Sequence, residues 1–187
     1  MSEAKARLRE LLRTHSYREG DFVLASGRRS SFYVDVRRTS LTAEGAALIG
    51  ETLLELMLAQ GWRPDGVGGM TLGADPLTTA VGIAAHRAGV PLSCFIVRKQ
   101  AKDHGTGRQI EAGGDLPDGG AVVVLDDTVT TGGSTLQSVE ALQRAGYRVL
   151  GALCLVDREE GGAQALADAG VALVPLFRLS DLREPGA

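Results

Sequence analysis

The stretch that most constrains the fold is residues 122–134, which read VVVLDDTVTTGGS. Its first four residues are branched and apolar, and such a short continuous run is typical of a strand buried on both faces. Two adjacent carboxylates, Asp126 and Asp127, end the run. A loop of hydroxyls and glycines then leads into a helical pattern that closes at Gly146. This order predicts one strand–loop–helix unit of an α/β sheet.

The loop has the composition of a phosphate-binding turn. Glycines let backbone N–H groups approach an anion, hydroxyls add donors, and the positive end of the following helix favours negative charge. The acid pair would repel a phosphate, but a carboxylate accepts hydrogen bonds from neighbouring sugar hydroxyls. The stretch therefore predicts a ribose 5-phosphate site. The alternative, a solvated turn that contains Asp and Thr by chance, explains the glycines but not the acid pair.

Two common phosphate loops are excluded by the sequence. No Lys follows Gly132 and Gly133, so the stretch is not a P-loop, and the chain contains no G-x-G-x-x-G. The stretch resembles instead the 13-residue signature of type I phosphoribosyltransferases, which bind phosphoribosyl pyrophosphate (PRPP). The resemblance implies PRPP binding without naming the acceptor base.

Length and charge limit the remaining classes. A chain of 187 residues is expected to form one domain with a full core. The net charge of −3 argues against a nucleic-acid or membrane partner, and no apolar stretch is long enough to span a bilayer. The N-terminus does not read as a signal peptide. Cys94 and Cys154 fall in predicted strands and are interpreted as buried thiols, which favours a reducing cytoplasm.

Strand and helix patterns alternate along most of the chain. Strands are expected at residues 21–25, 31–36, 66–70, 91–97, 122–125, 148–156 and 171–177. Helices are expected at residues 4–15, 42–60, 76–88, 136–146 and 161–169, with Thr42 as an N-cap and Pro76 near a first helical position. This alternation predicts a parallel sheet whose ligands bind at the carboxyl ends of the strands.

A long polar loop, residues 98–111, follows the strand that ends at Val97. Two of the three lysines of the chain, Lys99 and Lys102, lie three residues apart in it. A solvated charged loop is one interpretation. A loop that closes over a departing pyrophosphate is the other, because cations stabilise that leaving group and closure excludes water.

The loop closely resembles the R-K-x-x-K-x-H-G catalytic loop of orotate phosphoribosyltransferases. The resemblance extends in order to residues 26–30 with Tyr33 and Asp35, to residues 68–76, and to Asp157 and Arg158. It implies a single type I phosphoribosyltransferase domain over residues 1–187, with a central parallel sheet flanked by helices. A small hood would come from about residues 1–40 and the last strand.

The resemblance also implies the reaction, in which orotate and PRPP give orotidine 5′-phosphate and pyrophosphate in pyrimidine (UMP) biosynthesis. The implied catalytic residues are Lys102, His104, Asp126 and Asp127. The implied PRPP-binding residues are Arg98, Lys99, Lys102, His104, Asp126, Asp127, Thr128, Val129, Thr130, Thr131, Gly132, Gly133 and Ser134. Thr130 and Arg158 would contact orotate, and a guanidinium fork suits a planar carboxylate.

Mg²⁺ is the expected cofactor, bound mainly through PRPP and water, with no protein ligand named. The family further implies a cytoplasmic homodimer with shared active sites. Two positions depart from some members, which carry Lys where this chain has Ala25 and Gly73; each change removes a candidate phosphate contact. Two alternatives remain open: a phosphoribosyltransferase for another base, and a PRPP-sensing regulator without turnover.

Overall fold

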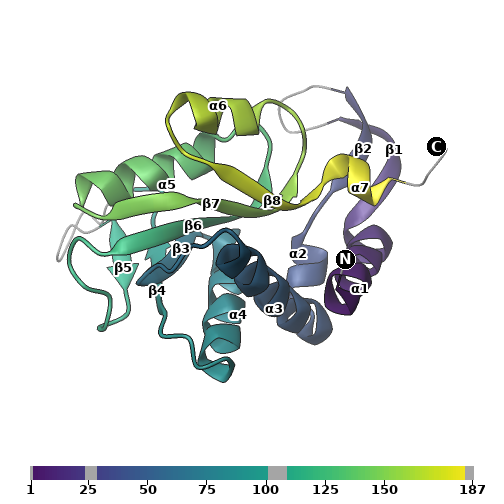
Figure 1. Cartoon of the computed structure of the whole chain (residues 1–187). Helices are drawn as coiled ribbons and strands as arrows, with labels where there is room; N and C mark the ends of the chain where they lie inside the picture. Colours follow the sequence, from purple (N-terminus) through teal and green to yellow (C-terminus); the bar gives the residue numbers. More distant parts are fainter. Residues whose placement is uncertain (1, 24–28, 101–108, 184–187) are drawn as a thin grey trace.

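The computed structural model describes residues 2–23, 29–100 and 109–183. Its centre is a six-stranded sheet in the order β5-β4-β3-β6-β7-β8, and a hairpin of β1 and β2 lies at one end (Figure 1). The strands are β1 (Tyr17–Val23), β2 (Arg29–Val34), β3 (Gly66–Met70), β4 (Ser93–Val97), β5 (Ile110–Ala112), β6 (Ala121–Val129), β7 (Arg148–Asp157) and β8 (Leu173–Arg178). The helices are α1 (Glu3–Leu11), the π-helix η1 (Leu12–Ser16), α2 (Arg37–Ser40), α3 (Ala43–Ala59), α4 (Ala74–Arg87), α5 (Gly133–Arg144), α6 (Gly162–Asp168) and α7 (Leu179–Leu182).

The central sheet is parallel except at one edge. Strands β4, β3, β6, β7 and β8 pair in parallel, as predicted, whereas β5 pairs antiparallel with β4. The short strand β5 was not expected, because three residues at the end of a polar loop carry too little periodicity to be recognised. The predicted central sheet flanked by helices is therefore observed, with a mixed rather than an all-parallel strand arrangement.

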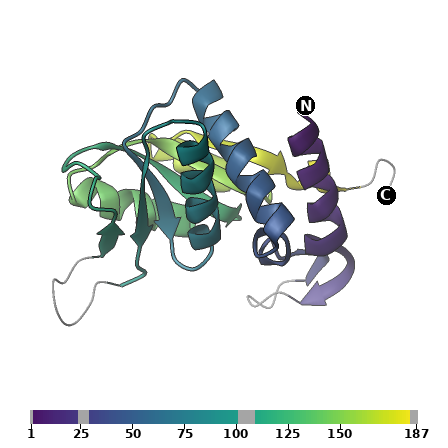
Figure 2. The same ribbon diagram turned by 90° about the horizontal axis from the view of Figure 1, so that it is seen from below.

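Alternate side chains of β6 serve two cores. Val123 and Leu125 pack into a cluster with α1, α3 and α4, whereas Val122 and Val124 face a cluster with α5 and α6. Figures 1 and 2 show these helices on opposite faces of the sheet. All four side chains are at most 1% exposed, so the continuous apolar run reflects a strand covered on both faces.

Several boundaries differ from the sequence-based expectation. The side chain of Thr42 caps α3 by accepting a hydrogen bond from the Gly45 N–H at 3.1 Å, as predicted. Helix α4 begins at Ala74, which makes Pro76 its third residue rather than its first. Strand β6 continues through the acid pair to Val129, because β7 provides hydrogen-bond partners beyond the apolar run.

The predicted composition of the hood needs one correction. Strand β8 was assigned to the hood, but it pairs with β7 in the central sheet. The segment after β8 is what approaches the N-terminal region, since Arg9 donates a 2.6 Å hydrogen bond from Nε to the carbonyl of Asp181. Leu8 and Leu12 belong to the same buried cluster as Phe177 of β8, so the N-terminal helix packs directly on the central core.

Within the described ranges, no helix combines the length and apolar character needed to cross a membrane.

Candidate active site

The acid pair lies at the carboxyl end of the central strand β6. Asp126 is 7% exposed, and its Oδ2 accepts a 2.6 Å hydrogen bond from Oγ1 of Thr135 on α5. Asp127 is half-buried and lies against the turn before α4. The pair thus occupies the sheet edge at which ligands of parallel sheets bind.

Burial changes the ionisation of both acids. Loss of hydration raises the pKa of Asp126 to about 6, while the hydrogen bond from Thr135 opposes this rise. Burial also raises the pKa of Asp127, and the positive charge of Arg37 acts in the opposite direction. A buried carboxylate gains most from a ligand that donates hydrogen bonds, and two sugar hydroxyls meet this requirement.

The predicted phosphate loop joins β6 to α5. Gly132 is the N-cap residue of α5 and has a left-handed backbone with φ of 83°, which glycine adopts without strain. No side chain caps this helix end. The first N–H groups of an α-helix lack intrahelical partners, so the start of α5 offers donors to an anion.

Backbone hydrogen bonds attach a second loop to the phosphate loop. The N–H of Arg158 donates to the carbonyl of Val129 at 2.9 Å, and the N–H of Gly162 donates to the carbonyl of Thr130 at 3.0 Å. The loop after β7 therefore runs beside the loop after β6. Thr130 and Arg158, both predicted to contact the acceptor base, lie in these adjoining segments.

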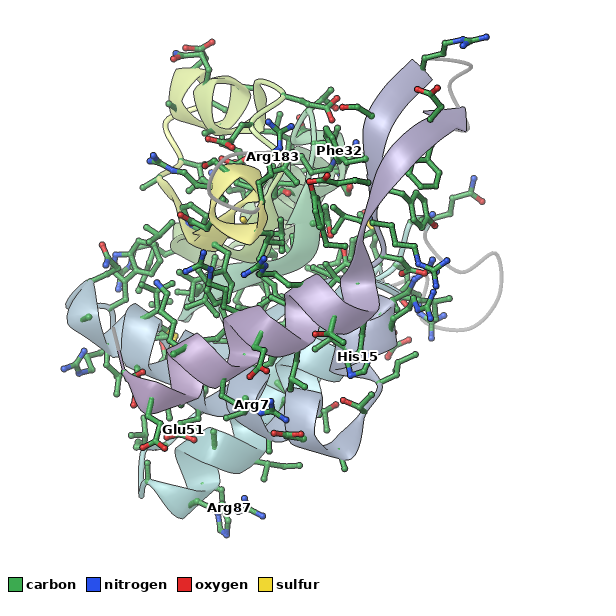
Figure 3. All side chains as sticks on the ribbon, turned by 90° about the vertical axis from the view of Figure 1, so that its right-hand side faces the viewer. Arg7, His15, Phe32, Glu51, Arg87 and Arg183 are labelled. Carbon is green, nitrogen blue, oxygen red and sulfur yellow. The ribbon has the colours of Figure 1, made fainter. Side chains whose placement is uncertain are left out.

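The side chain of Arg158 is held between the core and the hood. It is 12% exposed, and its Nη2 lies 2.9 Å from Oε1 of Glu160. Its guanidinium carbon is 5.2 Å from the ring centre of Phe32 on β2, and that of Arg183 is equally close to the same ring. Figure 3 shows Phe32 and Arg183 side by side between the hood hairpin and α7. Cation–π attraction thus joins the hood to the loop after β7.

Gly73 allows Asp127 to lie close to the start of α4. A Cβ atom at Gly73 would be 2.7 Å from Oδ1 of Asp127, closer than ordinary contacts allow. The Asp127 carboxylate therefore occupies the space that a side chain at position 73 would need. Nearby, Oγ1 of Thr71 donates a 2.7 Å hydrogen bond to Oδ2 of Asp75.

The predicted pyrophosphate-binding cations are only partly within the described residues. Arg98 follows β4, and its Nε lies 3.2 Å from Oε1 of Glu111 on β5, with Lys99 exposed beside it. Strand β3 separates β4 from β6, which places these cations about 10 Å along the sheet edge from the acid pair. Lys102, His104 and the hood residues Ala25 to Arg28 lie outside the described residues.

Comparisons with known proteins agree with this geometry. The family model of the phosphoribosyl transferase domain matches residues 72–171. An orotate phosphoribosyltransferase of Thermosynechococcus vestitus is 46% identical over 97% of this chain and 96% of its own length. The chain belongs to the orotate phosphoribosyltransferase family. A relative from Corynebacterium glutamicum is 44% identical over 97% of this chain and 95% of its own.

Solved structures of the family have the same fold. The orotate phosphoribosyltransferase of Mycobacterium tuberculosis, in complex with Fe(III) dicitrate, gives a TM-score of 0.84 at 41% identity and covers 97% of this chain and 99% of its own. The same protein in complex with PRPP gives 0.79 at 38% identity, over 96% and 98%. The adenine phosphoribosyltransferase of Leishmania donovani, at 17% identity and 0.65, shares the fold alone. The chain is accordingly a phosphoribosyltransferase enzyme.

Sequence reasoning on this family member missed the residues that support the site. Thr135 lies one residue beyond the recognised signature, and a capping or turn role is the usual reading of a Thr there. Phe32, Arg37 and Glu160 reach the site from segments whose patterns carry no chemical signal of their own. Only Glu160 had a local clue, its position two residues after Arg158.

Proposed function

We propose that PRPP binds along the carboxyl edge of the sheet and orotate beside it, at Arg158. Asp126 and Asp127 accept hydrogen bonds from the ribose hydroxyls. The 5-phosphate occupies the loop from Thr130 to Ser134, and Arg98, Lys99, Lys102 and His104 bind the pyrophosphate. The observation that carries this proposal is the pair of backbone hydrogen bonds between the loops after β6 and β7, because they hold a buried guanidinium next to the phosphate loop.

The reaction exchanges one bond at the anomeric carbon of the ribose. The bond to the pyrophosphate oxygen breaks and its electron pair leaves with pyrophosphate. A ring nitrogen of orotate forms the new bond, and the proton of that nitrogen is released to water. An oxocarbenium-like transition state is expected, as in other glycosyl transfers. The carboxylates of Asp126 and Asp127 favour the positive charge that develops on the sugar. Arg158 orients orotate through its carboxylate, with Thr130 on the neighbouring segment.

Mg²⁺ is proposed as the cofactor, held mainly by PRPP oxygens and water. In the part of the chain that the structure describes, no group of three or more His, Cys, Asp or Glu side chains forms a metal site. Mg²⁺ keeps several waters and commonly binds through substrate phosphates, so the oxygens of PRPP and water would hold it without a protein ligand. When bound, the ion supplies positive charge to the departing pyrophosphate.

A cytoplasmic homodimer is proposed as the working form. The free thiols of Cys94 and Cys154, in β4 and β7, suit a reducing compartment. In the dimer, the loop of residues 98–111 of one subunit would close over the PRPP site of its partner. A two-fold interface repeats this exchange reciprocally.

A spectrophotometric assay tests the proposed function. Protein, PRPP and Mg²⁺ are mixed with orotate, and the loss of orotate absorbance is followed, with adenine, hypoxanthine and uracil in parallel. We expect turnover with orotate and little with the other bases. Turnover with one of those bases instead would show a different acceptor, and PRPP binding without any turnover would indicate a regulator.

Arg158 is tested by substitution. Arg158→Ala should raise the KM for orotate tenfold or more, a magnitude typical of losing a hydrogen bond to a charged group, and leave the KM for PRPP nearly unchanged. Arg158→Lys should recover little, because a point charge does not replace a bidentate fork. Unchanged orotate affinity in Arg158→Ala would remove Arg158 from the acceptor site.

A further inference from the structure

The ion pair between Arg158 and Glu160 is unusual in its burial. The Arg158 side chain is 12% exposed and that of Glu160 18% exposed, whereas the surface pair of Arg144 and Glu140 on α5 is 67% and 64% exposed. Removing a charge from water costs several kcal/mol unless a partner compensates. The negative charge of Glu160 thus compensates the positive charge of the Arg158 guanidinium, which is buried between the hood and the core.

The geometry of the pair leaves two guanidinium donors without a hydrogen bond among the described residues. Nη2 of Arg158 lies 2.9 Å from Oε1 of Glu160, but without the direction of a hydrogen bond. Among the described residues, neither Nε nor Nη2 of Arg158 has a hydrogen-bond partner, although both atoms are buried. Buried donors of this kind are rare in folded proteins and favour a ligand that accepts from them. Nε and Nη2 form the edge of the fork that grips a carboxylate in bidentate fashion.

The loop that carries both residues is fixed at Glu159, which lies between them. The N–H of Glu159 donates to Oδ1 of the buried Asp157 at 2.9 Å, and Glu159 has a left-handed φ of 59°. The carboxylate of Glu159 accepts from the N–H of Ser180 at 2.9 Å, which ties the loop to α7. This backbone turn directs Glu159 to α7 and leaves Glu160 beside Arg158.

We infer that Glu160 is a positioning residue for orotate: it balances the charge of Arg158 and holds the fork with its Nε–Nη2 edge ready for the substrate carboxylate. The inference rests on the proposed contact between Arg158 and orotate. Phe32 completes the arrangement, because its ring lies 5.2 Å from the guanidinium carbon and limits the rotation of the fork. Glu160 does not touch orotate in this scheme and acts only through Arg158.

Glu160→Gln tests the inference with little change in shape. We expect the KM for orotate to rise about tenfold, with kcat within about threefold of the unchanged protein and the KM for PRPP unaffected. Preference for orotate over uracil, which lacks the carboxylate, should fall by the same factor as orotate affinity. Glu160→Asp, which keeps the charge, should recover part of the loss. Glu140→Gln is the matched control, an exposed member of an Arg–Glu pair, and should leave all constants unchanged.

A double-mutant cycle separates the possible results. If Glu160 acts through Arg158, adding Glu160→Gln to Arg158→Ala should raise the orotate KM no further. An unchanged or lower orotate KM in Glu160→Gln would overturn the inference, and a lower value would make Glu160 a competitor of the substrate. If Arg158→Ala itself leaves orotate affinity intact, the proposed acceptor site is wrong. Thermal unfolding of each variant identifies any loss that comes from misfolding.

Discussion

Thr135 on α5 donates a 2.6 Å hydrogen bond to Asp126 on β6, and both side chains are buried. The bond thus connects α5, whose first N–H groups are offered to a phosphate, with Asp126, the acid proposed to bind the ribose. It also fixes the orientation of the Asp126 carboxylate, because Oδ2 is held by the Thr135 hydroxyl. Thr135, which lies outside the recognised signature, thereby orients the carboxylate of Asp126, which lies inside it.

Thr135→Val should weaken PRPP use in a pH-dependent way. The pKa of Asp126 is raised to about 6, so kcat/KM for PRPP should fall as the pH drops through this region and the carboxylate becomes protonated. The hydrogen bond from Thr135 lowers that pKa, and its loss should move the midpoint to higher pH. At pH 7 we expect a loss of about tenfold, in line with a hydrogen bond to a charged group. A pH profile of kcat/KM measures both effects, and an unshifted midpoint would contradict the assignment.

Asp126→Asn should lose activity and gain stability. Because burial raises the pKa of Asp126 in the folded chain, the folded state binds more protons than the unfolded state between pH 3.8 and about 6. This group's contribution to stability therefore declines as the pH rises through that range. Asp126→Asn lacks the carboxylate and therefore this decline. The difference between its urea unfolding midpoint and that of the unchanged protein should grow from pH 4 to pH 7. Equal midpoints at every pH would mean that the carboxylate is not destabilised by burial.

Gly73→Ala should displace Asp127. The new Cβ would lie 2.7 Å from Oδ1 of Asp127, so the carboxylate must move away from the start of α4. We expect the KM for PRPP to rise severalfold while the fold persists. Gly114→Ala is the control, because a Cβ there meets no atom within 4 Å. An unaltered PRPP constant in Gly73→Ala would show that the position of Asp127 is not critical.

Mixed dimers test the proposed sharing of active sites. Lys102→Ala and Asp127→Ala should each be inactive alone, since one lacks a cation for pyrophosphate and the other a ribose carboxylate. In a mixed dimer one site combines the intact loop of one subunit with the intact acid pair of the other. Random exchange makes half of the dimers mixed, with one good site of two, so roughly a quarter of the activity should return. Subunit exchange is verified by mass spectrometry of tagged chains. Exchange without recovered activity would mean that the loop serves its own subunit.

The sequence alone determined the chemistry of the central unit. Continuous apolar residues before Asp126, and hydroxyls and glycines after Asp127, are local patterns, and each reflects the environment of its own segment. The strand, the loop and the helix were therefore predictable. The order and spacing of the motifs along the chain were also sufficient to predict the family, and the comparisons confirm that prediction.

Tertiary structure alone decided which residues support these groups. Phe32 and Arg158 are far apart in the sequence, yet the packing of the hood on the core brings them within 5.2 Å. Strand β5 and the place of β8 in the sheet depend on hydrogen-bond partners supplied by other strands. The buried edge of Arg158 and its pairing with Glu160 likewise depend on what covers them. Periodicity records the burial of a segment but not the identity of its neighbours, and the electrostatics of the site come from those neighbours.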